Sequence, residues 1–187
     1  MFNNLRSDLA TYEWDFARQG LWAMAVYRFG RWRYGFRNRF VRMPLSAVYK
    51  VLKVLSQIAT GIDLPCEVVV GERFKIEHFG GIIISGDVIF GDDVIIRDGV
   101  TIGLRRTGVR GAPRIGNRVD IGTGAKILGD ITIGDNVTIG ANAVVLTDVP
   151  ANSIAVGVPA RIIARPVADG RTATAEPASQ CESSLDR

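Results

Sequence analysis

Residues 115–145 read IGNRVDIGTGAKILGDITIGDNVTIGANAVV and repeat every six residues. An aliphatic side chain opens each repeat, at Ile115, Ile121, Ile127, Ile133, Ile139 and Val145. An apolar or small side chain follows four residues later, at Val119, Ala125, Ile131, Val137 and Ala143. The same frame extends upstream through Ile84, Phe90, Ile96 and Ile102. A period of six fits neither an α-helix nor an alternating strand. It is typical of a coil whose turns stack short flat faces into a prism.

Composition divides the chain into three parts. Residues 1–60 predict an N-terminal helical cap, residues 61–165 carry the six-residue period, and residues 166–187 predict a disordered tail. Within the cap we expect a helix that begins at Pro44, with apolar residues along one face at Val48, Val51, Leu52, Leu55 and Ile58. Because such coils cover their own faces poorly, we expect a mainly β, parallel β-helical protein that assembles as a homotrimer.

The positive charge of the chain is confined to the cap. Residues 1–60 hold ten Lys+Arg against three Asp+Glu, whereas the remainder holds thirteen against sixteen. Between residues 18 and 53 arginines alternate with aromatic side chains. Two interpretations stay open: the aromatic side chains pack against the coil or a neighbouring subunit, or the segment makes a peripheral membrane contact with anionic headgroups. No nucleic-acid-binding module accompanies the charge, so nucleic acid is not an expected partner.

Cysteines and the N-terminus favour a cytoplasmic protein. Cys66 and Cys181 lie far apart and without metal-ligand spacing, which predicts neither a disulfide framework nor a zinc site. The first twenty residues carry five charged side chains, so we expect no signal peptide. No uncharged run reaches the length of a transmembrane helix.

One interruption of the period predicts a functional loop. Thirteen residues separate Ile102 from Ile115 where six would complete the repeat. The extra residues must leave the coil as a loop, and loops on rigid scaffolds are common sites of binding and catalysis. We expect Arg105 and Arg110 of this loop to contact the substrate.

His78 is the only histidine in the chain. One histidine per chain cannot supply the several imidazoles of a histidine-bound metal site, so no metal is expected. Histidine is the side chain whose unperturbed pKa lies near neutrality, which suits a general base. Asp63 lies fifteen residues earlier, so the two could meet on neighbouring turns, where a carboxylate would fix the histidine tautomer. An isolated histidine could equally be held by the backbone alone.

Three motifs then carry a family resemblance: IGTGAKILGD (121–130), IGANAVVLTDVP (139–150) and VGVPAR (156–161). Together they resemble the serine acetyltransferase branch of the hexapeptide-repeat acyltransferases over roughly residues 60–163. The resemblance implies a left-handed parallel β-helix that transfers an acetyl group from acetyl-CoA to a hydroxyl. It further implies His78 as the base, Asp63 as its carboxylate partner and Glu77 as an acceptor contact. The residues implied to line an acetyl-CoA cleft between subunits are Gly103, Gly124, Ala125, Lys126, Ala143, Gly157, Pro159 and Arg161.

The chain departs from serine acetyltransferases after the loop. Those enzymes carry Arg-His-Pro-Lys-Ile there, with two side chains that hold the amino-acid acceptor, whereas this chain reads GAPRI at 111–115. A site that clamps a carboxylate should not lose its polar ligands. The sequence is similar in this respect to short acetyltransferases of exopolysaccharide and capsule clusters. We therefore expect the acceptor to be a sugar or a lipid-linked polysaccharide precursor, met near the inner face of the membrane. The alternatives are a serine O-acetyltransferase of cysteine biosynthesis and a catalytically silent scaffold.

Overall fold

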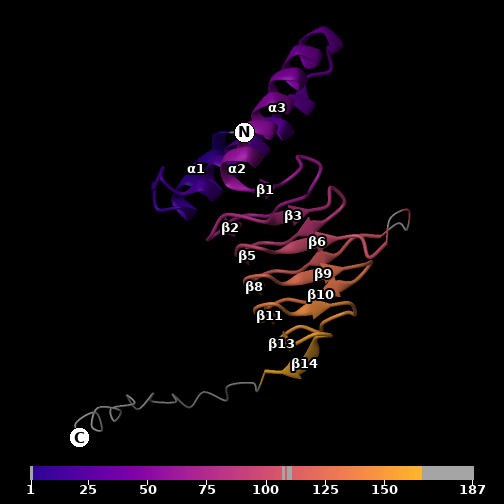
Figure 1. The fold of residues 1–187 in the computed structure, drawn as a ribbon. Helices are drawn as coiled ribbons and strands as arrows, with labels where there is room; N and C mark the ends of the chain where they lie inside the picture. The colour runs from indigo at the N-terminus through magenta and orange to yellow at the C-terminus, as the bar shows by residue number, and fades with distance from the viewer. Residues whose placement is uncertain (1, 107, 109–110, 166–187) are drawn as a thin grey trace, which may run out of the picture.

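The computed structural model describes residues 2–106, 108 and 111–165. It shows a column of stacked turns with the helices at its N-terminal end (Figure 1). Each strand is two to four residues long. In chain order the strands are β1 (Ile62–Asp63), β2 (Lys75–Ile76), β3 (Ile82–Ile84), β4 (Ile89–Phe90), β5 (Ile95–Ile96), β6 (Thr101–Gly103), β7 (Arg114–Ile115), β8 (Asp120–Ile121), β9 (Lys126–Leu128), β10 (Thr132–Ile133), β11 (Thr138–Ile139), β12 (Val144–Val145), β13 (Ser153–Val156) and β14 (Arg161–Ala164).

The strands form three sheets, one on each side of the column. Their orders are β1-β3-β6-β9-β12, β10-β7-β4 and β14-β13-β11-β8-β5-β2. Successive strands along the chain enter different sheets and pair in parallel with the turn before, except that β14 pairs antiparallel with β13. The predicted β-helical coil is therefore confirmed.

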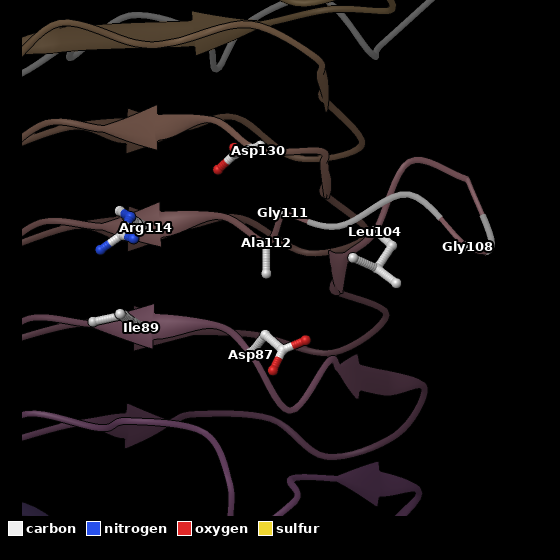
Figure 2. Close-up of a pocket in the computed structure, with 8 residues that line it drawn as sticks. All are labelled: Asp87, Ile89, Leu104, Gly108, Gly111, Ala112, Arg114 and Asp130. Carbon is white, nitrogen blue, oxygen red and sulfur yellow. The ribbon is translucent and has the colours of Figure 1, made fainter.

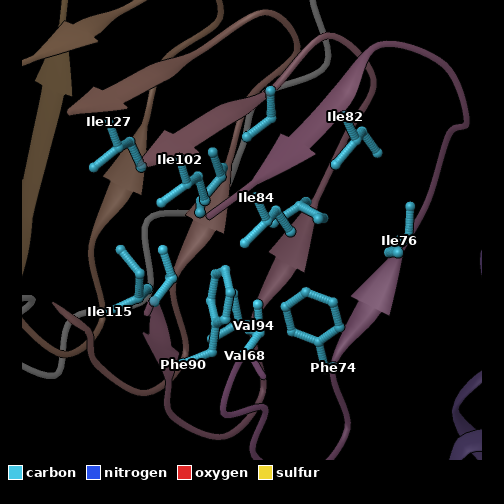
Figure 3. Packing of buried hydrophobic residues seen from close by; sticks show 14 of the residues in the cluster. Val68, Phe74, Ile76, Ile82, Ile84, Phe90, Val94, Ile102, Ile115 and Ile127 are labelled. Atoms are coloured by element: carbon cyan, nitrogen blue, oxygen red, sulfur yellow. The ribbon is translucent and has the colours of Figure 1, made fainter. Parts of the chain in front are cut away.

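Aliphatic side chains fill the interior of the column (Figure 3). Strand pairing stacks Ile84, Ile102 and Ile127 directly above one another. In the wider first turns the rings of Phe74 and Phe90 pack with centroids 5.0 Å apart. All six positions that open the repeats are at most 3% exposed: Ile115, Ile121, Ile127, Ile133, Ile139 and Val145. Full burial of such a side chain is worth on the order of 1.5–3 kcal/mol.

A polar ladder runs along one edge of the column and ties the turns together. The Glu72 N–H donates to the Asp92 carboxylate at 2.7 Å, and the Asp92 N–H donates to the Asn117 side chain at 2.9 Å. The Asn117 N–H in turn donates to the Asp135 carboxylate at 2.7 Å, which holds the pKa of Asp135 below its ordinary value. Each rung satisfies a backbone donor that the corner would otherwise leave open.

The predicted loop leaves the column between β6 and β7. Gly103 still pairs with Leu128, and regular pairing resumes at Arg114 opposite Ile89 and Thr132. Arg110 lies outside the described residues. The loop therefore leaves the column at the end of β6, in one sheet, and returns to it at the start of β7, in another sheet.

The cap contains α1 (Phe2–Thr11), α2 (Gln19–Trp32), the 3-10 turn η1 (Arg33–Gly35) and α3 (Arg39–Thr60). The prediction that a helix begins at Pro44 is wrong, because α3 begins five residues earlier. There the Asn38 side chain caps it by accepting from the Phe40 N–H at 2.9 Å. Pro44 costs one backbone hydrogen bond inside an exposed turn, where water can replace it. None of the described helices is long and apolar enough to cross a bilayer.

Tyrosines of the cap bond to the backbone of the first coil turns. The Ile76 N–H donates to the Tyr12 hydroxyl at 2.8 Å, and the Tyr27 hydroxyl donates to the Val68 carbonyl at 2.9 Å. Burial raises the pKa of Tyr12. The Cys66 N–H donates to the Tyr49 hydroxyl at 3.1 Å. These bonds satisfy strand donors and acceptors that have no earlier turn to pair with. The predicted tail, residues 166–187, lies outside the described residues.

Gly122 tests how closely the turns are stacked. A Cβ added at Gly122 would lie 2.7 Å from the Ala141 backbone nitrogen and 2.9 Å from the Gly140 carbonyl carbon. We expect Gly122→Ala to lower the free energy of unfolding by about 1–3 kcal/mol, since backbone cannot move aside as a side chain can. Chemical denaturation monitored by circular dichroism measures this. Gly35→Ala is the control, because no atom lies within 4 Å of its added Cβ. Equal stability of the two variants would contradict the tight stacking.

Candidate active site

His78 lies on a bulge at one corner of the column. Strand register matches Ile76 with Ile96 and Ile84 with Ile102. Eight residues lead from Ile76 to Ile84, whereas six lead from Ile96 to Ile102 on the next turn, so the His78 corner holds two extra residues. Gly80 and Gly81 turn the bulge with φ of 105° and 64°. The His78 side chain is exposed. The general base that the sequence predicts is therefore presented on the surface rather than packed in the core.

Asp63 lies beside this corner, on the outer side of β1. A Cβ at Gly61 would touch the Gly80 Cα at 3.0 Å, so the chain just before Asp63 rests on the His78 bulge. Asp63 Oδ1 is buried, and the Lys53 ammonium of α3 lies 3.1 Å away. The geometry of that contact is not that of a hydrogen bond, and Oδ1 accepts none from any described residue. The partner of this oxygen in the structure is therefore the Lys53 ammonium, and no hydrogen bond or ion pair of the described residues joins Asp63 to His78.

Glu77 belongs to a chain of ion pairs. Its carboxylate lies 3.1 Å from the Arg97 guanidinium and 3.6 Å from the Lys75 ammonium. Arg97 also binds Asp120, and that bond is the main cause of its raised pKa. Glu77 is therefore held as a fixed carboxylate next to His78.

Small residues form a strip along the same edge of the column. A Cβ at Gly81 would meet Gly99 at 3.4 Å, and one at Gly99 would meet Gly124 at 3.3 Å. Lys126 points outward next to this strip, and its ammonium donates to Thr101 Oγ1 at 3.1 Å and to the Gly99 carbonyl.

The remaining predicted cofactor residues extend or underlie this strip. The Val144 N–H donates to the Gly157 carbonyl at 3.0 Å, so the segment that contains Gly157 and Pro159 lies against β12. Arg161, at the start of β14, is exposed. Ala125 and Ala143 are fully buried in the core, so only their backbones can face a ligand.

Gly103 and Arg105 lie at the opposite edge of the same sheet. Gly103 packs against Ser85, and the Arg105 side chain is exposed on the loop. Beside them an open cavity of about 610 Å³ lies between the described part of the loop and the outside of the column (Figure 2). Its walls are Asp87, Ile89, Leu104, Gly108, Gly111, Ala112, Arg114 and Asp130.

The two aspartates flank the floor of this cavity. Asp130 lies on the turn to one side of Ala112 and Asp87 on the turn to the other (Figure 2). Gly111 has φ of 116°, and a Cβ there would lie 2.4 Å from the Asp130 Cβ. A side chain at 111 would therefore collide with Asp130, and the glycine is what allows this carboxylate to stand at the cavity wall.

Within a single chain, His78 and the loop cavity lie at opposite edges of one sheet. From Gly99, on the His78 edge, to Gly103, on the cavity edge, the extended chain spans roughly 13 Å. The structure thus brings the predicted residues into two groups. His78, Asp63 and Glu77 form one, with the small-residue strip below them, and Gly103 and Arg105 form the other.

Sequence reasoning missed several residues of both groups. Lys53 reaches Asp63 only because α3 folds back over β1, which no local pattern signals. Asp87 and Asp130 occupy corners that carry acidic residues throughout the coil, so their spacing did not distinguish them. Arg97 could have been found from the sequence. Glu77 directly follows β2 and Arg97 directly follows β5, and these two strands pair in register. Among the described residues no three His, Cys, Asp or Glu side chains gather as potential metal ligands.

Known proteins share both the repeat and the sequence. Residues 112–147 match the family "Bacterial transferase hexapeptide (six repeats)". The chain is 41% identical over 125 residues to WcaB of Escherichia coli K12, a protein assigned as a colanic acid biosynthesis acetyltransferase; the match covers 67% of this chain and 75% of that protein. It is 38% identical over 149 residues to a serine acetyltransferase of Mycobacterium tuberculosis, covering 79% of this chain and 62% of that enzyme.

Solved structures show the same fold. A serine acetyltransferase from Brucella abortus S19, in complex with coenzyme A, superposes with a TM-score of 0.74 at 30% identity; the match covers 88% of this chain and 68% of that one. This similarity confirms the left-handed parallel β-helix with an N-terminal helical part. The chain belongs to the bacterial hexapeptide-repeat transferases and, within them, to the acetyltransferases that include WcaB and the serine acetyltransferases.

Proposed function

We propose that this protein is a cytoplasmic O-acetyltransferase that moves the acetyl group of acetyl-CoA to a hydroxyl of a sugar or polysaccharide precursor. It would work as a homotrimer, with each site between two copies. The separation of His78 from the cavity supports this arrangement, because a ring of prisms can set the histidine edge of one copy against the cavity edge of the next. A trimer would thus complete a site that one chain holds only in halves.

His78 would act as the general base in a direct transfer. Its free ring nitrogen takes the proton of the acceptor hydroxyl as the oxygen attacks the thioester carbonyl carbon. The tetrahedral intermediate then collapses, the C–S bond breaks, and the imidazolium returns its proton to the departing CoA thiolate. The products are an acetyl ester and free CoA, with no net change at His78. The buried oxygen of Asp63 is the acceptor that would hold the other ring nitrogen as N–H and stabilise the imidazolium.

The small-residue strip is the surface that fits acetyl-CoA. Stacked glycines at Gly81, Gly99 and Gly124 leave the strip without side chains as far as Asn142, which packs against Gly124, so part of an extended pantetheine could lie along it. Lys126 and Arg161 are the cations within reach of its phosphates. Lys126 would exchange its present bond to Thr101 for such a contact.

The loop cavity is the observation that carries the choice of acceptor. Its volume lies within the roughly 300–1,000 Å³ typical of small-molecule sites, and a single serine would fill little of it. Asp87 and Asp130 are well suited to accept hydrogen bonds from several sugar hydroxyls. At its floor Ala112 and Gly111 offer no cation to an amino-acid carboxylate.

Serine remains the second candidate, on the strength of the relatives. Several serine acetyltransferases share 35–40% identity with this chain, among them the enzyme of Helicobacter pylori at 40%. Arg114 at the cavity wall is the one described cation there that could meet a serine carboxylate. The two candidates therefore differ in whether Arg114 or the aspartate pair selects the acceptor.

The base is tested with His78→Ala. We expect acetyl-CoA turnover to fall by about 100- to 10,000-fold, the range of general-base contributions. Thiol release from acetyl-CoA measures it, and the melting temperature should be unchanged because the side chain is exposed. Asp63→Asn should lose less activity and move the pH profile, since it leaves the base in place and removes the negative charge beside it, which also pairs with Lys53. Full activity of His78→Ala would leave a scaffold role as the better explanation.

The acceptor is tested with L-serine beside a panel of hexoses and short oligosaccharides. We expect a sugar to raise thiol release and serine to leave it unchanged. Asp87→Asn and Asp130→Asn should each raise the KM for that sugar about tenfold, as loss of a hydrogen bond to a charged group would. The KM for acetyl-CoA should stay constant. Serine-dependent turnover that is lost in Arg114→Gln would instead establish the amino-acid acceptor.

A further inference from the structure

Most apolar side chains of helix α3 face away from the rest of the protein, which is unusual for a helix that packs on a fold. The residues that it turns toward the rest of the protein are polar or amphipathic: Tyr49 and Thr60 are buried, and Lys53 and Ser56 line the junction with α2 and β1. These four recur at intervals of four, three and four residues, so they form one stripe of the helix. An ordinary surface helix would bury an apolar stripe instead.

The opposite side of α3 is a wide apolar surface. Nine large apolar side chains of this helix are between 38% and 86% exposed, most of them on that side and Leu52 bordering the inward stripe: Phe40, Val41, Met43, Val48, Val51, Leu52, Val54, Leu55 and Ile58. Val51, Leu55 and Ile58 lie at intervals of four and three, about half a turn around the helix from Lys53. In Figure 1 α3 projects beyond the first coil turn, away from the column. We call this set of nine residues the outer face of α3.

The charges around the outer face point to an anionic occupant. From Phe16 to Ile62 the chain holds nine Arg or Lys and no Asp or Glu. Five of the nine cations are engaged within the protein: Arg18 pairs with Asp15, Arg28 with Asp8 and Lys53 with Asp63, Arg33 is buried, and Arg31 donates to the Val68 carbonyl. On α3 itself Arg39, Arg42 and Lys50 are exposed and form no ion pair with any described residue. A second copy docked through the same face would bring like charges together and offer no carboxylate from α3 in return.

We propose that the outer face of α3 docks in the plane of an anionic lipid bilayer, with Arg39, Arg42 and Lys50 at the phosphate level. A long helix with one apolar side and only basic charge is the form that lies in the membrane interface. On α2 the side chains of Leu21, Met24 and Tyr27 are buried and Trp22 and Trp32 are exposed, so the continuous apolar surface belongs to α3. The inference does not depend on the proposed acceptor: the docking would hold for any hydroxyl substrate.

Vesicle flotation of the full chain tests the docking. The wild type should float with vesicles of phosphatidylcholine and phosphatidylglycerol and bind vesicles of phosphatidylcholine alone much more weakly. Val51→Glu with Leu55→Glu should abolish flotation, and the binding constant should fall about fivefold for each of Arg39→Gln, Arg42→Gln and Lys50→Gln. Val69→Glu is the matched control, since Val69 is equally apolar, is 43% exposed and lies on the coil. It should float like the wild type.

Sedimentation equilibrium separates the docking from self-association. We expect the wild type and the Val51→Glu, Leu55→Glu variant to have the same mass in solution and the same rate of acetyl-CoA turnover. A wild type that stays unbound to anionic vesicles would overturn the proposal. So would a double variant that floats normally. A loss of mass in the double variant would show instead that another copy covers the outer face.

Discussion

The structure depends on one constraint, which is that every turn of the column must pair in parallel with the turn before while burying an aliphatic side chain on each side. Parallel pairing of strands only two or three residues long is weak by itself. The stacked interior, with Ile102 and Ile127 in register, supplies the missing stability. A slip of one residue would turn each of these side chains to solvent, so the register is strongly determined. Because the register is fixed, each corner of the column has a defined position along its axis, and functional side chains can be placed on these corners.

Chemistry is concentrated where this constraint is relaxed. Two extra residues at the His78 corner and the long loop before Arg114 are the interruptions of the period with chemical groups on them. The first presents His78 on a corner next to the turn that carries Asp63, and the second borders an open cavity with two aspartates. Because they lie at opposite edges of one sheet, the proposed site is one that two copies would complete. A repeat fold that grows by stacking can therefore place a base and an acceptor pocket independently.

The cap solves a different problem from the coil. Its first two helices complete the open end of the column, where Tyr12 and Tyr27 satisfy backbone groups of the first turns. α3 does little of this work, and it meets the coil through Tyr49 and Lys53 while its apolar side faces outward. Lys53 also forms an ion pair between this helix and Asp63. A bilayer bound to the outer face of α3 would therefore contact a helix that this ion pair joins to the proposed dyad of His78 and Asp63.

A six-residue period and a unique histidine are local properties of the chain, so the coil, its buried positions, the loop and the candidate base could all be predicted from the order of residues. The sequence did not determine which side of α3 faces the coil: the apolar stripe was visible, but its burial depends on what packs beside it. The prediction that α3 starts at Pro44 was wrong. The helix begins at Arg39, because the Asn38 side chain caps it there and Pro44 is tolerated inside its first turns. Only the tertiary structure decided that Lys53 meets Asp63, that Glu77 is held by Arg97, and that Asp87 and Asp130 face one cavity. Each of these contacts joins residues from different turns or elements, and their distance in space is set by stacking, which the linear order of residues does not contain.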